Sequence, residues 1–576
     1  MASSASHSLP DFPDILYHIF SFLDPVHHLR HEHNQVYESC RSLALAARTC
    51  RTFTGPALDV LWKRLPDDQP LADLLCQLGI AAARGEGQGD PELVGRNKPD
   101  RYRLPNQHRG GYCDREAKKT FERRWRLSRG YDIRYSLQDV GDPRQHPAWP
   151  RFVWYASRVR AITLYAFDGP AWCAIWEELR SRTDAAPILP NVLSVAFCRI
   201  SWHALTPGAF ALISPSVSRL NFNLGDEYSW PASDGNLRSL FSQCFTSAPG
   251  IDHLRLEFPL SRLGLPLLQA HCFRLCHLEV VPLLDLDDLR LLTGLPALQH
   301  LSISLSREDF PAASASLTFR SVSTLVVEGT WSNLAAFLAA AHLPLMHTLS
   351  ITGWEYGEPA AELAKAATHV FHTLAAKHPS LPTLSVSATR GREPPSVGCV
   401  SYDIIPIADT FVASLLDLVR PLLALSALRC LSLAFPSYFD VVCTEADLRA
   451  VAEAFPALEA FHLHISRYDP GAGNPWQIPP VEEPEEAPLR GGVGAAAGDG
   501  KEPHGLRTLV IPKVLLPPGE VDAVGEVGDV VGAAFPLVSS VFRRARLVVE
   551  GGWAMAVDGA AARCPDCGRG SEMSFA

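Results

Sequence analysis

A short apolar pattern that recurs along most of the chain constrains its fold more than any other feature. The pattern is L-x-x-L-x-L, with Leu, Val, Ile or Phe at the apolar positions, and its first copy begins at Val159. The central residues Leu278, Leu301, Leu325 and Leu349 follow one another at steps of 23, 24 and 24 residues. A regular step of this length indicates that each copy forms one structural unit, and that the units stack side by side.

Alternating apolar residues within each copy predict a short strand with one buried face. The copies lie at 159–164, 192–197, 217–222, 251–256, 275–280, 298–303, 322–327, 345–351, 381–386, 428–433, 458–463 and 506–511, with a last strand-like segment at 545–549. Segments such as 335–338 and 448–452 have helical character and supply return paths. Period and pattern resemble leucine-rich repeats, so we expect an irregular α/β solenoid whose parallel strands line a concave face. An α/β domain of another topology is the alternative.

Two stretches with helical apolar spacing precede the repeats. Residues 15–23 place apolar side chains along a helix of about three turns. Residues 43–53 predict a second helix, Gly55-Pro56 is expected to break the chain, and residues 58–65 predict a third short helix. Three helices of this length have a small core, so they form a small bundle that gains stability by docking on a partner.

The order of residues in these helices resembles an F-box, in the version common to basidiomycete F-box proteins. Three segments carry the resemblance. They are Asp-Ile-Leu-x-x-Ile-Phe-x-x-Leu from Asp14, Leu-Ala-x-x-Ala-Arg-Thr-Cys-Arg-x-Phe from Leu43, and Pro-Ala-Leu-Asp-x-Leu-Trp from Pro56. The resemblance implies that this region binds a Skp-type adaptor and so joins a cullin-RING ubiquitin ligase. The motif positions carry over to Pro10 or Pro13, Ile15, Leu16, Ile19, Phe20, Leu23, Leu45, Cys50, Leu61 and Trp62. The connector 24–42 is longer than the usual link, and three core helices of an ordinary domain are the alternative.

Composition narrows the class of protein. The chain of 576 residues is 47% hydrophobic and 20% charged, which is typical of globular rather than disordered proteins. Its net charge of −10 argues against a chain that binds polyanions as a whole. The 14 cysteines are scattered, and several, such as Cys272, Cys276 and Cys430, lie within the repeats, which predicts reduced core residues. No signal-peptide pattern and no apolar run of about 20 residues is present, so we expect a soluble cytoplasmic or nuclear protein without a membrane partner.

One segment, 96–134, is rich in Arg and aromatic residues and is the best nucleic-acid candidate in the chain. Asp114, Glu116 and Glu122 interleave with the cations, as they do on a solvated helix face. Phe121 and Trp125 are four residues apart, as packing residues on a helix are. Nucleic-acid binding is therefore not expected.

The resulting domain prediction has four parts. It comprises an F-box-like helical domain at 1–66, a helical and basic bridge at 67–156, a repeat solenoid at 157–559 and a flexible tail at 560–576. Within the solenoid, the Pro-rich, acidic and Gly-rich stretch 467–505 is predicted to be a disordered insert, because its composition cannot form a packed core.

Motifs for chemistry are weak throughout. The segment 492–497 formally matches a dinucleotide fingerprint but follows no strand. A His-rich stretch with His27, His28, His31 and His33 has no thiolate nearby except Cys40, and Cys564 with Cys567 forms only half a zinc-binding pattern. No nucleophile elbow, His-Glu-x-x-His helix or phosphate loop occurs. We therefore expect no enzyme, no cofactor and no metal site, with metal binding at the Cys564 pair left open.

Taken with the resemblance, these patterns predict the substrate-recognition subunit of a cullin-RING ligase. The helices would bind the adaptor, and the concave face of the repeats would bind an unknown target protein. Exposed strand positions suited to target contact are His253, Arg255, His300, Ser302, His347 and Thr348. The alternative is a leucine-rich-repeat scaffold for protein interactions with no role in ubiquitination.

Overall fold

The computed structural model describes fourteen segments of the chain. These are residues 13–24, 33–85, 133–138, 141–165, 174–198, 207–223, 234–257, 264–306, 316–355, 360–390, 411–435, 439–442, 445–465 and 508–510. The chain divides into two compact units. Unit 1 comprises 1–282, 287–298 and 394–402, and unit 2 comprises 283–286, 299–393 and 403–576.

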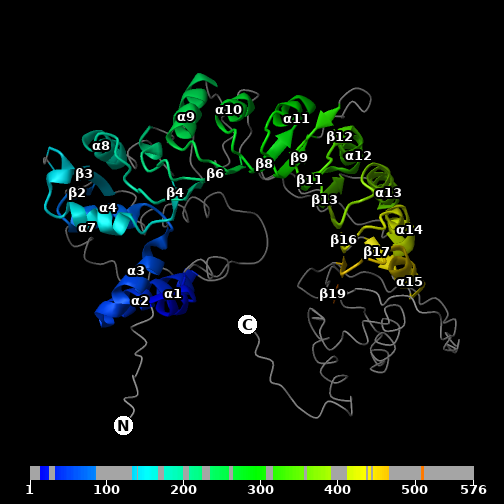
Figure 1. Cartoon of the computed structure of the whole chain (residues 1–576), viewed down its shortest axis with the longest axis horizontal. Coiled ribbons are helices and arrows are strands. Elements are labelled where there is room, and N and C mark those ends of the chain that lie inside the picture. The colour runs from blue at the N-terminus through cyan, green and yellow to red at the C-terminus, as the bar shows by residue number, and fades with distance from the viewer. Residues whose placement is uncertain are drawn as a thin grey trace, which may run out of the picture. The chain divides into compact units, whose positions relative to one another are not determined.

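Unit 1 begins with three helices that pack on one another (Figure 1). They are α1 (Pro13–Ser21), α2 (His33–Thr49) and α3 (Arg51–Lys63). Their shared core consists of Leu16, Phe20, Leu43, Ala57 and Val60, each no more than 7% exposed. Each fully buried Leu or Phe of this kind contributes about 1.5–3 kcal/mol of hydrophobic free energy, so the small bundle has a core of its own.

Several boundaries in this region differ from the sequence prediction. Gly55-Pro56 does not break the chain but lies inside α3. Proline removes one backbone donor there, and the burial of nearby residues such as Val60 offsets that loss. The predicted helix 43–53 is divided at Cys50, whose extended backbone forms the N-cap of α3. Leu65 belongs to a strand and not to the third helix, and α2 takes up most of the predicted connector.

The main sheet of unit 1 is parallel throughout. Its strands, in spatial order, are β1 (Arg64–Leu65), β4 (Ala161–Tyr165), β5 (Ser194–Cys198), β6 (Arg219–Asn223), β7 (His253–Leu256) and β8 (His277–Leu284). The central apolar residues of the repeats are in register across neighbouring strands, as in the pair Leu254 and Leu278. Both are fully buried, so each repeat adds one layer to a continuous core.

The segments between the strands of unit 1 return mainly through helices and turns. They contain α4 (Gln69–Gln77), α7 (Trp149–Ala156), α8 (Ala174–Arg182), α9 (Asp234–Ser247), α10 (Gly264–His271), α11 (Leu286–Leu292) and the 3-10 turns η4 (Pro143–Gln145) and η7 (Pro207–Phe210). A small antiparallel ladder of β2 (Ala81–Gly85) and β3 (Ile133–Leu137) interrupts the predicted helical bridge. Helices such as α9 and α10 cover one face of the sheet (Figure 1), and we term the other face, as far as the described residues show it, the open face.

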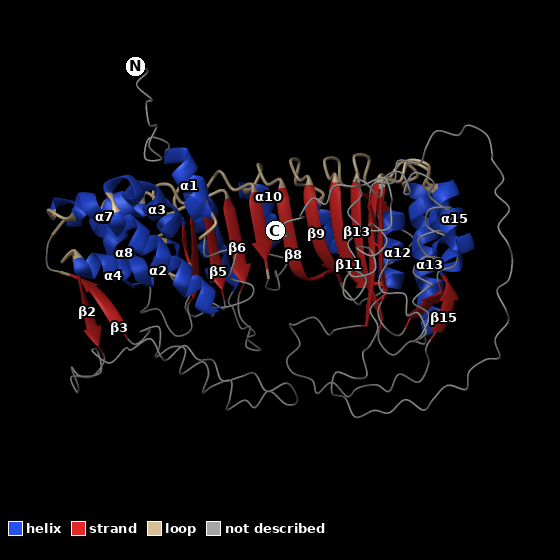
Figure 2. Cartoon of the chain, turned by 90° about the horizontal axis from the view of Figure 1, so that it is seen from below, coloured by secondary structure: helices blue, strands red, loops and turns tan. Residues whose placement is uncertain are grey.

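Unit 2 repeats the same plan with longer strands. Its main sheet contains β9 (His300–Leu305), β11 (Thr324–Thr330), β13 (Thr348–Glu355), β14 (Thr383–Arg390), β16 (Cys430–Phe435), β18 (Ala460–Ile465) and β19 (Thr508–Val510), all parallel. The return segments contain α12 (Trp331–Ala340), α13 (Ala360–Lys377), α14 (Leu415–Val419), η8 (Arg420–Ala424) and α15 (Glu445–Ala454). Two small parallel pairs, β10 (Leu317–Thr318) with β12 (Ala341–His342) and β15 (Phe411–Ser414) with β17 (Phe439–Val442), lie beside them. Figure 2 shows the main strands of each unit side by side and pointing the same way.

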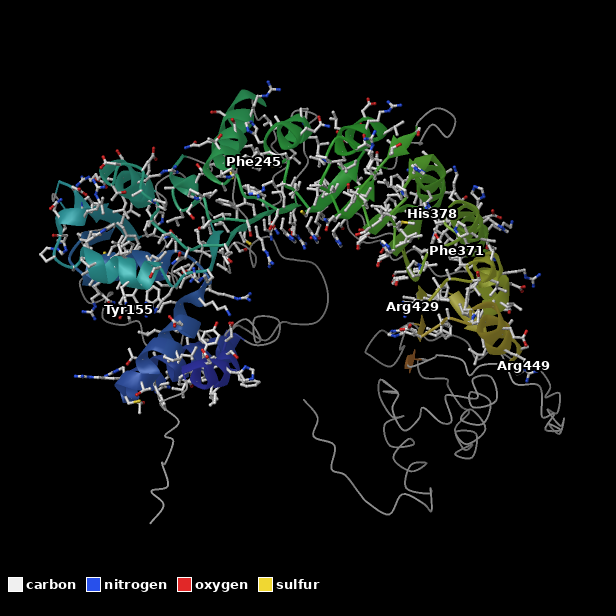
Figure 3. All side chains as sticks on the ribbon, in the orientation of Figure 1. Tyr155, Phe245, Phe371, His378, Arg429 and Arg449 are labelled. Carbon is white, nitrogen blue, oxygen red and sulfur yellow. The ribbon has the colours of Figure 1, made fainter. Side chains whose placement is uncertain are left out.

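The strand prediction from the repeat pattern is confirmed for all twelve copies at 159–511. Among the described strands of the main sheets, β1 was missed, because two residues are too few to show an alternation. The strands of the three small pairs, β2 with β3, β10 with β12 and β15 with β17, were not predicted either. Figure 3 shows side chains filling the layer between strands and helices, with Phe245 on α9 and Phe371 on α13, both nearly inaccessible. The structure therefore describes a mixed α/β repeat fold of the leucine-rich-repeat kind, with its core between the sheet and the helices.

Some sequence predictions lie outside the described residues. These are the basic segment 96–132, the insert 467–505, the strand-like segment 545–549 and the tail 560–576. The eight described cysteines are free thiols, but only Cys244 and Cys272 are buried. Cys276 and Cys430, predicted to be core residues, are partly accessible, because they occupy the outward positions of the repeat pattern. None of the helices among the described residues is long and apolar enough to cross a membrane.

Candidate protein-interaction surfaces

Helix α1 presents two different apolar faces. Leu16 and Phe20 point into the bundle core, where Phe20 meets Phe53 edge to face at 5.6 Å between ring centroids. On the other side, Ile15, Ile19 and Phe22 are 46%, 44% and 69% exposed. Ile15 and Ile19 lie one turn apart on α1, and Phe22 follows in the turn directly after its last residue, Ser21. These three exposed side chains are here termed the α1 apolar face.

The predicted adaptor-binding residues divide between surface and interior. Ile15, Ile19, Leu45 and Cys50 are exposed. The remaining described residues of the set have buried or partly buried side chains, namely Leu16, Phe20, Leu23, Leu61 and Trp62. Pro10 lies outside the described residues, and Pro13 is the first residue of α1. Phe22, in the turn directly after α1, is 69% exposed and was missed, although its spacing of seven from Ile15 is a helical signal.

Helix α3 passes directly into the sheet of unit 1. It ends at Lys63, and β1 follows at once and pairs with β4. The junction is fixed by side chains from α3 and α7: Trp62 packs on Tyr155 with ring centroids 4.9 Å apart. Arg158 pairs with Asp59 at 2.9 Å; the arginine side chain is 15% exposed and the carboxylate is 48% exposed, so only the arginine is shielded from solvent. The three helices are therefore joined to the first repeats by a strand pairing and by packed side chains.

Arg158 has a second set of contacts at the same junction. Its guanidinium lies 3.5 Å from the centroid of the Trp154 ring, which is a cation-π contact. Its Nη1 donates to the backbone oxygen of Trp154 at 2.7 Å. One side chain thus connects α3 with the end of α7.

A buried carboxyl lies where α4 begins. Asp68 precedes α4, and its carboxyl accepts a hydrogen bond from Nε1 of the fully buried Trp176 in α8 at 2.6 Å. Burial raises the pKa of Asp68 to about 7, and the charge of Asp67 acts in the same direction, whereas the Trp176 hydrogen bond lowers it. Asp68 therefore changes charge close to neutral pH.

A second carboxyl joins α4 to the β2–β3 ladder. The hydroxyl of Tyr135 in β3 donates to Asp73 of α4 at 2.8 Å. Burial raises the pKa of both groups, and the Asp73 charge raises that of Tyr135 further. Tyr135 is thus a neutral hydrogen-bond donor at any physiological pH.

The open face of the unit 1 sheet is charged. Arg255 of β7 contacts Glu257 at 2.5 Å and Glu279 of β8 at 2.9 Å, and Asn223 of β6 donates to Glu257. This arrangement satisfies the guanidinium within the protein. Beside it, the imidazole of His253 in β7 stacks on that of His277 in β8, with ring centroids 3.9 Å apart.

The open face of the unit 2 sheet is instead dominated by hydroxyl groups. Outward positions of five neighbouring strands, β9, β11, β13, β14 and β16, align in three rows. The rows read His300, Thr324, Thr348, Thr383, Cys430, then Ser302, Val326, Ser350, Ser385, Ser432, then Ser304, Glu328, Thr352, Ser387, Ala434. Ten of these fifteen side chains are Ser or Thr, nine of them partly exposed and Ser304 buried, and we term this surface the hydroxyl face.

The predicted target-binding residues mostly occupy outward strand positions. His253 and Arg255 lie on the open face of unit 1, and His300, Ser302 and Thr348 lie on that of unit 2. His347 differs, because it is in the turn before β13, where its backbone N–H bonds to the carbonyl of Ser323. The hydroxyl rows as a whole were not predicted, since they become visible only when the strands are placed in register.

Among the described residues, no group of three or more His, Cys, Asp or Glu side chains is placed to hold a metal ion. His27, His28, His31, Cys564 and Cys567 lie outside those residues, as does the side chain of His33. The predictions about metals and about catalysis are thus not tested at these positions.

Comparison with solved structures yields a distant structural likeness, and the other two comparisons find no match. No protein-family model matches the chain, and no curated protein matches it. A solved leucine-rich-repeat protein of Leptospira interrogans aligns at 12% sequence identity over 55% of this chain and 88% of its own, with a TM-score of 0.22. The assignment of a leucine-rich-repeat-like fold rests on the repeat period and the parallel strand ladder described above.

Proposed function

We propose that this protein is the substrate receptor of a Skp–cullin-type ubiquitin ligase, acting in the cytoplasm or nucleus. In this proposal the α1 apolar face binds a Skp-type adaptor, and the open face of the repeats binds a target protein. The observation that carries it is the exposure of Ile15 and Ile19 on α1 and of Phe22 in the turn directly after it, in a segment whose residue order resembles an F-box. A monomeric protein gains nothing from exposing three large apolar side chains within one short segment, whereas an interface does.

The hydrophobic free energy gained by burying the α1 apolar face is sufficient for a specific contact. Burying each of these side chains is worth about 1.5–3 kcal/mol. Part of that gain offsets the cost of association, so the exposed Leu45 on α2 and polar contacts around the patch add to the affinity. Leu16 and Phe20 have a different role in this proposal, since they hold α1 on the bundle and so present its outer face.

Ubiquitin transfer would then depend on position and not on a catalytic residue of this chain. Holding a target lysine near the loaded conjugating enzyme raises its effective concentration. That requires a firm connection between adaptor-binding helices and repeats, and the β1–β4 pairing with the Asp59–Arg158 contact supplies one within unit 1. We accordingly propose a receptor and not an enzyme.

The test is co-purification of the full chain with a Skp-type adaptor and a cullin. The informative variant is Ile19→Asp with Phe22→Asp, because both side chains are exposed and the bundle core is untouched. A buried unpaired carboxylate strongly disfavours an apolar interface, so binding should fall at least a hundredfold. Phe273→Asp is the matched control, since Phe273 is 61% exposed on a different part of unit 1.

Wild type and Phe273→Asp should bind the adaptor and the double variant should not, with unchanged melting temperatures in all three. Equal binding by the double variant would refute the assignment of the α1 apolar face. Failure of the wild-type chain to bind any adaptor would refute the ligase function and leave the protein as a repeat scaffold for interactions.

A further inference from the structure

The hydroxyl face of unit 2 contains one carboxylate. Glu328 of β11 is exposed and lies in register between Ser304 of β9 and Thr352 of β13. The surrounding protein raises the pKa of the Glu328 carboxyl, and a hydrogen bond with Ser304 opposes that shift. A carboxylate that has lost part of its hydration gains from a nearby cation. At the fifteen described positions of the hydroxyl face no Lys or Arg is present to supply one.

The geometry of the face matches an extended polypeptide. Alternate residues along a strand repeat at about 6.7 Å, and neighbouring strands lie about 4.8 Å apart, so the face measures about 13 Å by about 19 Å. An extended segment that runs parallel to the strands covers the about 13 Å of the three rows with about four residues. In this orientation its own alternate residues repeat at the about 6.7 Å spacing of the hydroxyl rows.

The chemistry of the face matches the same occupant. Each Ser or Thr hydroxyl both donates and accepts hydrogen bonds, as the N–H and C=O groups of an extended backbone require. The described side chains of the face include no Trp, Tyr or Phe, the ring types on which a sugar or a nucleobase would stack. A phosphorylated segment would place its negative charge beside Glu328, which is repulsive.

We propose that the hydroxyl face binds an extended, unphosphorylated polypeptide segment that places one Arg or Lys side chain on Glu328. The hydroxyl rows hold the backbone of the segment, and Glu328 selects its side chain. The inference rests on the proposed function only in identifying that segment as part of a ubiquitination target. An area this small supports weak, transient binding, with Kd on the order of micromolar.

The experiment uses the full chain without any adaptor. Five fluorescent hexapeptide libraries are compared by fluorescence polarisation. Each has one fixed residue at its third position (Arg, Lys, Gln, Glu or phosphoserine) and random Gly, Ala and Ser elsewhere. The Arg and Lys libraries should bind at least tenfold more tightly than the Gln library, and the Glu and phosphoserine libraries more weakly than the Gln library.

Variants connect the preference to the site. Glu328→Gln should abolish the difference between the Arg and Gln libraries, and Glu328→Arg should reverse the order so that the Glu library binds best. Glu362→Gln is the matched control, because Glu362 is an exposed carboxylate on α13 that pairs with Lys365. Ser350→Ala with Ser385→Ala should weaken all libraries alike, since it removes two hydroxyls of the central row.

Three outcomes would overturn the inference: equal binding of the Arg and Glu libraries, preference for phosphoserine, or an Arg preference that survives Glu328→Gln. The Ile19→Asp, Phe22→Asp variant should keep the Arg preference. Loss of adaptor binding with an intact Arg preference therefore refutes only the ligase function, and adaptor binding without an Arg preference refutes only this inference.

Discussion

The indole of Trp331 occupies the space beside Gly353 where any other residue would have its Cβ. Trp331 begins α12 and is 2% exposed, and Gly353 lies in β13, the next strand of the main sheet after this helix. The same indole meets Phe371 of α13 edge to face at 6.4 Å between centroids. The glycine thus allows a large aromatic side chain to fill the layer between sheet and helices.

We predict that Gly353→Ala lowers the free energy of unfolding by about 1–3 kcal/mol, because the methyl group would overlap with the Trp331 ring. Urea denaturation of the full chain measures the change. Gly55→Ala is the control, since a Cβ at Gly55 meets nothing within 4 Å and lies inside a helix. It should be neutral or stabilising by up to about 1 kcal/mol. Equal stability of both variants would contradict the overlap.

Asp68 should make stability depend on pH between about 4 and 7. Its pKa is about 7 in the folded protein and near 3.8 when unfolded, so in this range the folded state holds a proton that the unfolded state lacks. The contribution of Asp68 to the free energy of unfolding is therefore fully present below pH 4 and is lost as the pH rises through 7. In this range the free energy of unfolding falls by up to about 1.4 kcal/mol per pH unit.

Asp68→Asn tests this contribution, because the amide oxygen still accepts the hydrogen bond from Trp176 and carries no charge. The melting temperature of wild type minus that of the variant should fall between pH 5 and pH 8. Glu362→Gln, at an exposed carboxyl, should show no such trend. A pH-independent difference between wild type and Asp68→Asn would contradict the raised pKa.

Replacing Phe20 by alanine should lower the stability of the protein far more than replacing Phe22, two residues later. Phe20→Ala removes a core ring that is 7% exposed and should cost about 3–5 kcal/mol, with α1 losing protection from hydrogen exchange. Phe22→Ala removes a ring that is 69% exposed and should change stability by no more than about 0.5 kcal/mol. Similar destabilisation by both would show that the outer face of α1 is covered within the protein.

Arg158→Ala should loosen the junction between α3 and the first repeats. The change removes the ion pair with Asp59 and the contact with the Trp154 ring, for a loss of about 1–3 kcal/mol in stability. Hydrogen exchange should increase in β1 and at the end of α7. Adaptor binding should persist, because the α1 apolar face is unchanged. Loss of adaptor binding would show that the junction also contributes to the adaptor interface.

The strands of this protein follow from local pattern. Leu301, Leu325 and Leu349 repeat at constant steps of 24 residues, and buried apolar residues recur at alternate positions around each, so period and burial could be predicted together. The helices were harder to predict from the sequence, since Gly55-Pro56 is typical of a chain break but lies inside α3. Local propensity cannot show that buried neighbours will offset a lost hydrogen bond.

The interaction surfaces were predicted less completely than the fold. Residues 15–23 are apolar around much of the helix, and spacing alone could not tell that Phe20 is core while Ile19 and Phe22 are surface. The strand positions His300 and Ser302 were identified as outward-facing, but the rows they belong to were not.

By itself, the sequence determined the repeat period, the strand positions and the alternation of buried and exposed side chains, because these depend on neighbours a few residues apart. Only the tertiary structure decided which side of α1 stays uncovered and which hydroxyls gather around Glu328. Those relationships join residues of different helices and strands, and register between segments 20 or more residues apart is set by packing and not by local pattern.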